Sequence, residues 1–424
     1  MTHIRKLKEF IVNTDISKDS LIIKQVILNK EQEIIGYDLS IAKNNNLDTV
    51  IDTNDAQKIL CELYSELGIK QAIGDKKIYI TIDNELAIDP IIETILNPND
   101  ATLVLHINEY YTPDKLNKLI NLFNRKFTFG YDNFKSINDE KILQVRNYVK
   151  ILRINIDEFT HKELADCVSG LSNIYTFMAN NISSLNDFEY CKELGFTYFK
   201  GNYFANPQIV KGKKLSSNQI TLIKIINLLR KDVDNHVLEE QIKKAPTLAV
   251  NLISIVNTAD RGLSKKVSTV KDAISLLGRN KIARLMQLLL MVPDETVGDI
   301  KKSPILQVAV LRGDIMERMA AKIDPFNSKL KDDSFITGLL SMLPVALSIS
   351  LNTLLDYIEL NDEIKEALIH KDGILGTIYK VIEAYDNEHI EEYDKLLNTI
   401  PKKVISRQMM NRFLIESLEW INGE

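Results

Sequence analysis

The sequence has few cysteines and no excess of positive charge. Its three cysteines, Cys61, Cys167 and Cys191, are widely spaced. They form neither a disulfide framework nor a zinc-binding pattern, and we expect reduced thiols in a cytoplasmic protein. The chain has 53 Lys and Arg against 58 Asp and Glu, a formal net charge of −5. It therefore lacks the positive field that non-specific nucleic-acid binding requires, and nucleic acid is not an expected partner.

We expect neither a signal peptide nor a membrane span in this sequence. Lys24 interrupts the first apolar run, residues 21–28, so no signal-peptide core is present there. Residues 334–355 carry no charged side chain and are long enough to cross a bilayer. They include many polar residues and Pro344, which lipid would accommodate poorly. We expect a buried helix pair in this stretch and no membrane contact.

The composition is that of an ordinary globular protein, with 45% hydrophobic and 26% charged residues in 424. This length exceeds what one hydrophobic core usually supports, so two domains are expected. In the first half, short apolar runs rich in β-branched residues alternate with helical patterns, which favours a parallel sheet built of βα units. The expected strands are residues 21–28, 34–39, 78–82, 102–107, 127–131, 151–156, 174–178 and 196–199.

Eight strands in about 200 residues predict a closed barrel of the TIM type, with one antiparallel strand from the first hairpin. After Pro207 the pattern becomes helical, without strand alternation. The expected domains are a barrel over residues 1–207, a linker over 208–217 and an all-helical domain over 218–424. The fold class is therefore α/β followed by all-α.

Polar residues follow the strands where such barrels place their chemistry. This rim is short of carboxylates, and Asn stands at three strand ends, at 133, 155 and 180. A phosphodiesterase that uses divalent metals needs several anionic oxygen ligands and a base. An amide supplies one neutral oxygen and cannot act as a base.

The order of motifs in this half resembles the EAL domain, the cyclic di-GMP phosphodiesterase fold, in the subtype fused to an HDOD domain. The signature G-Y-E-L is written 36-GYDL-39, the metal glutamate matches Glu109, and D-D-F is written 132-DNF-134. The terminal Q-G-x-x-F-x-x-P motif is written 200-KGNYFANP-207. The resemblance implies an EAL barrel over residues of about 20–207.

Most catalytic positions of the EAL pattern are altered. The positions implied by the resemblance now hold Asp38 for Glu, Thr81 for a metal-ligating Asn, Asn133 for the second Asp of D-D-F, Arg153 for the catalytic Lys, Asn155 for Asp, Asn180 and Ser183 for two Glu, Lys200 for Gln and Ala42 for a phosphate-binding Arg. Only Glu109 and Asp132 remain as metal-type ligands. Two carboxylates make a weak site for Mg²⁺ or Mn²⁺. We expect no cofactor and a network of ion pairs, in which Asp38, Asp157, Arg153 and Lys200 engage these two carboxylates.

The helical half resembles the HDOD domain. The similarity rests on 257-NTA-259, on Ser268 to Gly278, and on 335-FITGLLS-341. HDOD domains are relatives of metal phosphohydrolases that carry an adjacent His-Asp pair. None of the six histidines here is followed by Asp, so no ligand set for two metals is expected.

A basic cluster follows Asn257 in this half. It consists of Arg261, Lys265, Lys266 and Lys271. One interpretation is an anion- or partner-binding surface at a helix N-terminus. The other, which we favour, is a solvated charged face with Asn257 capping the helix.

The sequence therefore predicts a cytoplasmic regulatory scaffold of signal transduction, a degenerate EAL domain fused to an HDOD domain, which acts through an unidentified signalling protein and has no enzyme activity. The alternatives are a residual cyclic di-GMP phosphodiesterase and a cyclic di-GMP sensor. The resemblance also implies a homodimer, since EAL barrels often pair.

Overall fold

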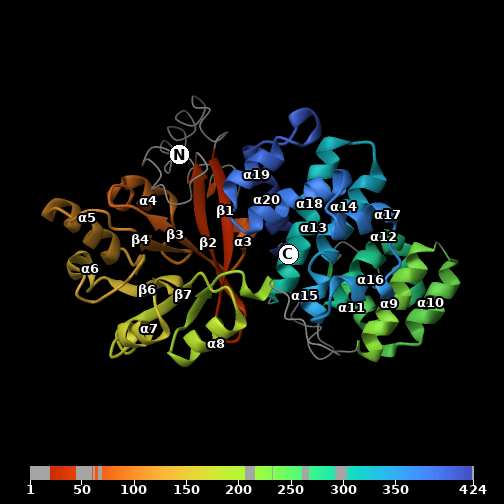
Figure 1. Ribbon diagram of the computed structural model, residues 1–424, viewed down its shortest axis with the longest axis horizontal. Helices are drawn as coiled ribbons and strands as arrows, with labels where there is room; N and C mark the ends of the chain where they lie inside the picture. The colour runs from red at the N-terminus through yellow and green to blue at the C-terminus, as the bar shows by residue number, and fades with distance from the viewer. Residues whose placement is uncertain are drawn as a thin grey trace. The chain divides into compact units, whose positions relative to one another are not determined.

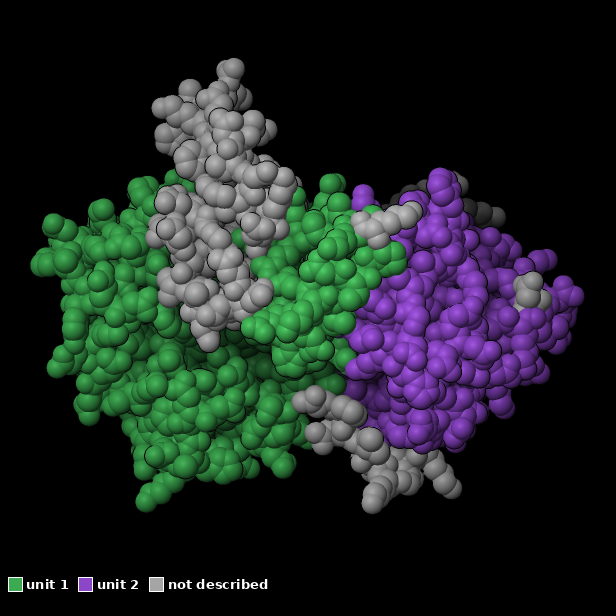
Figure 2. Space-filling model, turned by 45° about the horizontal axis from the view of Figure 1, so that its top comes forward, with its two compact units in different colours: residues 1–206, 381–424 green, residues 207–380 purple. Residues whose placement is uncertain are grey.

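A computed structural model describes residues 20–43, 60, 63–64, 69–205, 215–231, 233–259, 267–291 and 303–422. The chain divides into two compact units, residues 1–206 with 381–424, and residues 207–380 (Figure 2). The division after residue 380 differs from the expected boundaries, which gave all of 218–424 to the helical domain. Contacts made by residues 381–424 on the barrel, described below, account for this difference.

The first unit is a closed barrel of eight strands in sequence order (Figure 1). The strands are β1 (Ser20–Leu28), β2 (Ile34–Lys43), β3 (Lys77–Ile82), β4 (Ala101–Leu105), β5 (Thr128–Tyr131), β6 (Val149–Asn155), β7 (Thr176–Asn180) and β8 (Tyr198–Lys200). Strand β1 is antiparallel to both of its neighbours, and β2 to β8 run parallel. The structure confirms the predicted barrel and its antiparallel hairpin.

The barrel interior contains an apolar layer of Ile27, Tyr79, Val104, Ile151 and Met178. Side chains alternate between the two faces of a strand, so residues two positions apart share a face. One layer further toward the carboxyl ends of their strands lie Thr81, His106, Arg153 and Asn180. The polar residues of the predicted site therefore stand directly above an apolar floor.

Helices connect the parallel strands and cover the outside of the barrel (Figure 1). They are α3 (Ile69–Ile73), α4 (Pro90–Ile95), α5 (Pro113–Asn124), α6 (Glu140–Val145), α7 (His161–Val168) and α8 (Leu185–Glu193). Hydroxyl side chains begin several of them. In α7, for example, Thr160 and Glu163 form a reciprocal capping box, which satisfies two backbone N–H groups that the first turn leaves unpaired.

The C-terminal segment completes the barrel unit with α19 (Ile390–Leu397) and α20 (Arg407–Asn422), and α20 packs on α3 and β1. Pairing with β8 reaches only Ile27 and Leu28 of β1. The side chain of Asn411 accepts from the Ile22 amide at 2.8 Å and donates to the Ser20 carbonyl at 2.9 Å. The Tyr385 hydroxyl donates to the Ile22 carbonyl at 2.8 Å. These contacts satisfy backbone groups on the edge of β1 that β8 does not reach.

The second unit is helical. Its helices are α9 (Ser217–Arg230), α10 (Asn235–Lys243), α11 (Pro246–Ala259), α12 (Val270–Leu290), α13 (Pro304–Ile323), α14 (Ser328–Leu340), α15 (Leu343–Leu347), α16 (Leu351–Tyr357), α17 (Asp362–Ile369) and α18 (Gly373–Asp386). The division between the units falls within α18. Gly278 interrupts α12 with a φ of 75°, a conformation that glycine adopts without steric cost. The predicted all-helical second half is confirmed.

Within the described part of the chain, no single helix is long and apolar enough to cross a membrane. The segments Ser328–Leu347 and Leu351–Tyr357 together meet the criteria of length and composition, but they are bent by 110° relative to each other. They include the uncharged stretch that the sequence shows at 334–355.

Candidate ligand site at the carboxyl ends of the barrel strands

A buried carboxylate held by two cations forms the centre of the site. The Asp38 side chain accepts from Nη2 of Arg153 at 2.6 Å through Oδ1 and from Nζ of Lys200 at 2.5 Å through Oδ2. The three residues are 2%, 4% and 9% exposed, respectively. Charges this far removed from water persist only when they are paired. Each oxygen of Asp38 therefore already has a cationic partner.

Two further residues extend this network along the strand ends. Nη1 of Arg153 donates to Oγ1 of Thr81 at 3.0 Å and to Oδ1 of Asp132 at 3.4 Å. The second oxygen of Asp132 lies 3.0 Å from Nδ1 of His106. Asp38, Arg153 and Lys200 together with Asp132 and His106 are called the mouth network below.

The pKa values of the network follow its pairing. Burial alone would raise the pKa of Asp38, but Arg153 and Lys200 together lower it below its ordinary value. Burial also opposes the charged form of Asp132, yet Arg153 and the hydrogen bond from His106 lower its pKa. That hydrogen bond raises the pKa of His106 above 6.5. With His106 protonated, the mouth network carries three positive and two negative charges, which favours an anionic ligand.

A glycine fixes the position of Lys200. Gly201 follows it with a φ of 152°, and a Cβ there would lie 2.2 Å from the Ile182 carbonyl oxygen. The same stretch is held by the Ile182 amide, which donates to the Lys200 carbonyl at 3.1 Å. Any larger residue would push the end of β8 away from Ile182 and displace Lys200 from Asp38.

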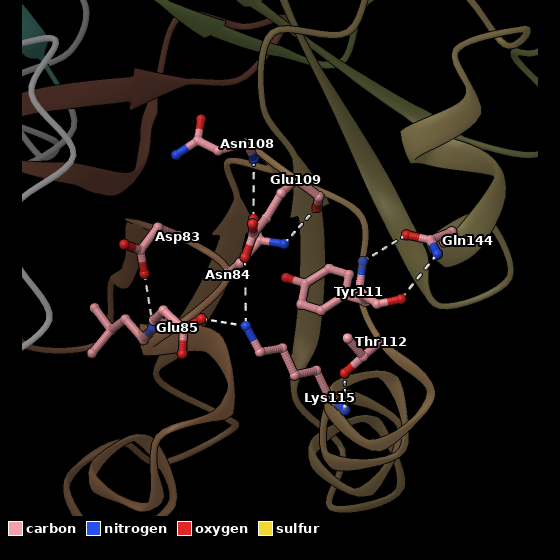
Figure 3. A network of polar contacts seen from close by, with 10 residues as sticks. Asp83, Asn84, Glu85, Asn108, Glu109, Tyr111, Thr112, Lys115 and Gln144 are labelled. Atoms are coloured by element: carbon pink, nitrogen blue, oxygen red, sulfur yellow. Dashed lines mark hydrogen bonds and ion pairs between the residues drawn. The ribbon is translucent and has the colours of Figure 1, made fainter.

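The second predicted metal ligand, Glu109, lies outside the mouth network. The Asn84 side chain donates to the backbone carbonyl of Glu109 at 2.7 Å. The Glu109 side chain is 66% exposed, and its carboxylate lies 3.5 Å from Nζ of Lys115 (Figure 3). Lys115 also pairs with Glu85. Glu109 and Asp132 therefore engage different cations and do not converge.

In the described part of the chain, the carboxylates at the strand ends are paired with cations and not grouped as ligands of a divalent metal. Across the described ranges, no three His, Cys, Asp or Glu side chains are placed to hold one ion. Both oxygens of Asp38 and of Asp132 already have partners within the mouth network. A metal would have to displace Arg153 or Lys200 from a buried carboxylate, which leaves a buried charge unpaired.

The remaining predicted positions have separate local partners. Asn155 accepts from Nδ2 of Asn181 at 2.9 Å and donates to Glu158 at 3.1 Å. Ser183 lies 3.3 Å from a carboxylate oxygen of Asp187. Asn133 is exposed and adopts a left-handed backbone with a φ of 52°, which Asn tolerates well. Asp157, expected as a member of the ion-pair network, is exposed outside the mouth network.

Asn180 differs from these positions. Its Oδ1 atom is shielded from solvent and has no hydrogen-bond partner among the described residues. The Nε atom of Arg153 is in the same situation. Unpaired buried polar atoms are rare in folded proteins and mark places where a further polar group is needed.

The basic cluster of the helical half is described only at its ends. Asn257 donates to the Val267 carbonyl at 2.8 Å and accepts from the Val267 amide at 2.8 Å, so it bridges the two ends of the loop. Lys271 is exposed near the start of α12. Arg261, Lys265 and Lys266 lie outside the described residues, and the surface they were predicted to form remains a prediction.

Two residues of this region were missed from the sequence. His106 could have been found, because it stands two positions after the buried Val104 and so faces the same interior. Glu388 follows α18, in a part of the chain that the resemblance assigns to the helical domain. Its Oε1 is shielded and unpaired among the described residues, and no local pattern connects it to a barrel strand 188 residues earlier, at Lys200.

Comparison with known proteins finds one domain family and two curated relatives to which the chain is similar. Residues 216–360 match the family model of the HDOD domain. Together with the eight-stranded barrel, this match fits the two-domain EAL–HDOD family that the sequence resembles. The chain is related to a cyclic di-GMP phosphodiesterase of that type.

That relative is cyclic di-GMP phosphodiesterase CdgJ of Vibrio cholerae, 23% identical over 86% of this chain and 84% of CdgJ. The uncharacterized protein YuxH of Bacillus subtilis is 22% identical over 95% of this chain and 98% of YuxH. Among solved structures, the Bacillus subtilis YkuI protein, with an EAL domain in complex with cyclic di-GMP and calcium, is 16% identical. The match covers 64% of this chain and 74% of that protein, with a TM-score of 0.37.

The relationship to CdgJ corrects one expectation. The sequence predicted no enzyme activity, because most catalytic positions of the EAL pattern are altered. CdgJ, which matches most of this chain, is named a cyclic di-GMP phosphodiesterase. The prediction that this chain is not an enzyme is therefore contradicted. The altered residues alone were an insufficient basis for it, since an altered ligand set excludes one arrangement of metals and not every arrangement.

Proposed function

We propose that this chain is a regulatory protein of cyclic di-GMP signalling that binds the dinucleotide at its barrel mouth through cationic side chains and without a divalent metal. The single observation that carries this proposal is the pairing of both Asp38 oxygens with Arg153 and Lys200. Arg153 also pairs with Asp132, so one positive charge remains for a ligand phosphate when His106 is protonated. The relationship to CdgJ, which is named a cyclic di-GMP phosphodiesterase, supports cyclic di-GMP as the ligand.

The chemistry of the site supports an anion rather than a metal. Arg153 keeps Nε without a partner among the described residues, and a guanidinium binds phosphate oxygens through such N–H groups. His106 adds a positive charge when protonated, because Asp132 raises its pKa. The apolar layer beneath the network excludes water, which strengthens these charge interactions. Binding at this site would then be conveyed to a protein partner.

Calorimetric titration with cyclic di-GMP in EDTA and in Mn²⁺ tests the proposal. We expect the same affinity in both buffers. We also expect Lys200→Gln to weaken binding about tenfold, because it removes one charge-assisted contact. Lys162→Gln, at an exposed position of α7, is the matched control and should leave binding unchanged. Binding that occurs only with Mn²⁺, or equal binding by Lys200→Gln and wild type, would contradict the proposal.

Hydrolysis of cyclic di-GMP is the second candidate function, favoured by the name of CdgJ. Glu109 and Asp132 are the carboxylates that the resemblance leaves for it, and the structure keeps them on separate cations. Measuring linear dinucleotide in the Mn²⁺ arm distinguishes the two candidates. Turnover that Asp132→Asn abolishes would favour hydrolysis over metal-free binding.

A further inference from the structure

Glu388 occupies a backbone position that usually belongs to glycine. At the end of α18 the His389 amide donates to the Ala384 carbonyl at 2.9 Å, and the Glu388 amide donates to the Tyr385 carbonyl at 3.1 Å. This pair of bonds is the Schellman motif, whose penultimate residue has a left-handed backbone. Glu388 has a φ of 59°. A side chain there is less favourable than glycine, and such outliers concentrate at functional positions.

The loop that carries Glu388 lies beside the end of β8, where Lys200 stands. Burial raises the pKa of Glu388, Lys200 opposes that rise, and Asp38 adds to it. The loop that carries Glu388 is tied to the end of β8, because Nδ2 of Asn202 donates to the Asp386 carbonyl at 2.8 Å. Residues 381–424 and the barrel form one compact unit, so this placement lies within one unit.

One oxygen of this carboxyl group has no partner. Oε1 of Glu388 is shielded from solvent without a hydrogen bond from any described residue, which costs free energy unless a ligand donor fills the position. Lys200 lowers the pKa of Glu388, but it forms its ion pair with Asp38 and not with Glu388. The carboxyl group therefore needs a hydrogen-bond donor that the described residues do not supply.

Among the parts of a cyclic dinucleotide, the bases and the ribose 2′-hydroxyls offer donors to such an oxygen, whereas the phosphates are anionic acceptors. Guanine presents two adjacent donors on its Watson–Crick edge, N1–H and the N2 amino group, and a carboxylate accepts both. Adenine presents an acceptor at N1 beside its N6 amino group, so the same carboxylate meets a lone pair. A site built to pair with a donor rejects the analogue that lacks it.

We propose that Glu388 is the guanine-selecting residue of the barrel mouth, accepting hydrogen bonds from N1–H and N2–H of one base while Arg153 and Lys200 hold a phosphate. This inference rests on the proposed function. It assigns base specificity to a residue outside the eight barrel strands, supplied by the segment that also covers the edge of β1.

Three dinucleotides separate this role from phosphate binding. Cyclic di-GMP, cyclic di-IMP and cyclic di-AMP share the phosphates and differ at the base edge, and inosine lacks only the N2 amino group. By calorimetry we expect wild-type protein to bind cyclic di-GMP at least about tenfold more tightly than cyclic di-AMP, with cyclic di-IMP in between. Equal affinities for all three would overturn the inference while leaving phosphate binding in place.

Two variants and one control complete the test. Glu388→Gln should weaken the binding of cyclic di-GMP about tenfold. It should also reduce the preference for cyclic di-GMP over cyclic di-AMP, because an amide group matches the donor and the acceptor on the edge of adenine. Glu388→Gly removes the side chain from a left-handed backbone position and should raise the melting temperature. It should also abolish the preference for cyclic di-GMP over cyclic di-AMP. A raised melting temperature would exclude misfolding as the cause of this loss. Glu391→Gln, exposed on α19, should behave as wild type.

The outcomes distinguish the two proposals. Wild-type binding with an unchanged base preference in both Glu388 variants would overturn only the role of Glu388. Absence of wild-type binding to cyclic di-GMP would overturn both. Loss of preference in Glu388→Gly with a raised melting temperature would support the inference, because a purely structural role predicts no change in preference.

Discussion

Two charged networks occupy the carboxyl ends of the barrel strands, and burial makes them different. In the mouth network, Asp38 and Arg153 are almost fully buried, and each charged oxygen has a close cation. Around Lys115, which is half-buried, the carboxylates of Glu85 and Glu109 are exposed, and that of Glu109 lies 3.5 Å from Nζ of Lys115 (Figure 3). Buried charges must be matched, while exposed charges are solvated whether or not they pair. The charges are therefore fixed in specific pairs in the mouth network, and not around Glu109 and Lys115.

The largest expected effect tests the buried network. Asp38→Asn leaves Lys200 without its carboxylate partner and Arg153 with Asp132 alone, and should lower the free energy of unfolding by about 3–5 kcal/mol. Urea denaturation followed by circular dichroism measures it. Asp157→Asn, exposed at the same end of the barrel, is the matched control and should not change stability. If both variants unfold at the same urea concentration, the contrast between buried and exposed charges fails.

A smaller effect tests the edge of the mouth network, where His106 is 36% exposed at its side chain. Its pKa is raised above 6.5 by Asp132, so the native state holds the proton more tightly than the unfolded state. This stabilisation is complete below the unfolded pKa and is lost as the pH rises through the folded pKa. The stability difference between wild type and His106→Gln should therefore be larger at about pH 5 than at about pH 9. A difference that grows with pH would contradict the ion pair.

The smallest effect belongs to the exposed network. Glu109→Gln removes one carboxylate of a solvated pair, while Lys115 keeps Glu85 as a partner. We expect the midpoint of urea unfolding to stay unchanged. A clear loss of stability would show that Glu109 is more than a surface residue, and would make the two networks alike.

The sequence predicted the barrel because its strands are apolar, β-branched runs with clear boundaries. The strands β1 and β3, for example, fall on residues 20–28 and 77–82, close to the predicted 21–28 and 78–82. Arg153 and Lys200 were expected as possible counterions because they replace residues of the EAL pattern. The choice of Asp38 over Glu109 as their main partner could not be predicted, since it depends on which side chains turn inward.

Glu388 and the C-terminal boundary lay beyond sequence reasoning for a different reason. Helices α19 and α20 carry the same apolar periodicity as the helices before them, and periodicity does not tell which surface a helix packs against. The contacts of Tyr385 and Asn411 are hydrogen bonds to backbone atoms of β1. Backbone partners leave no trace in side-chain pattern, so such long-range contacts are visible only in three dimensions.

The cover that Asn411 provides for β1 also sets an order of events during synthesis. Ile22 and Asn411 are 389 residues apart in sequence, so the ribosome makes the first strand long before the helix that caps its edge. Until then, polar groups on that edge are open to water or to chaperones, and a nascent chain lacking its last turns cannot bury them. The barrel unit can thus reach its final state only after the intervening helical unit has been translated.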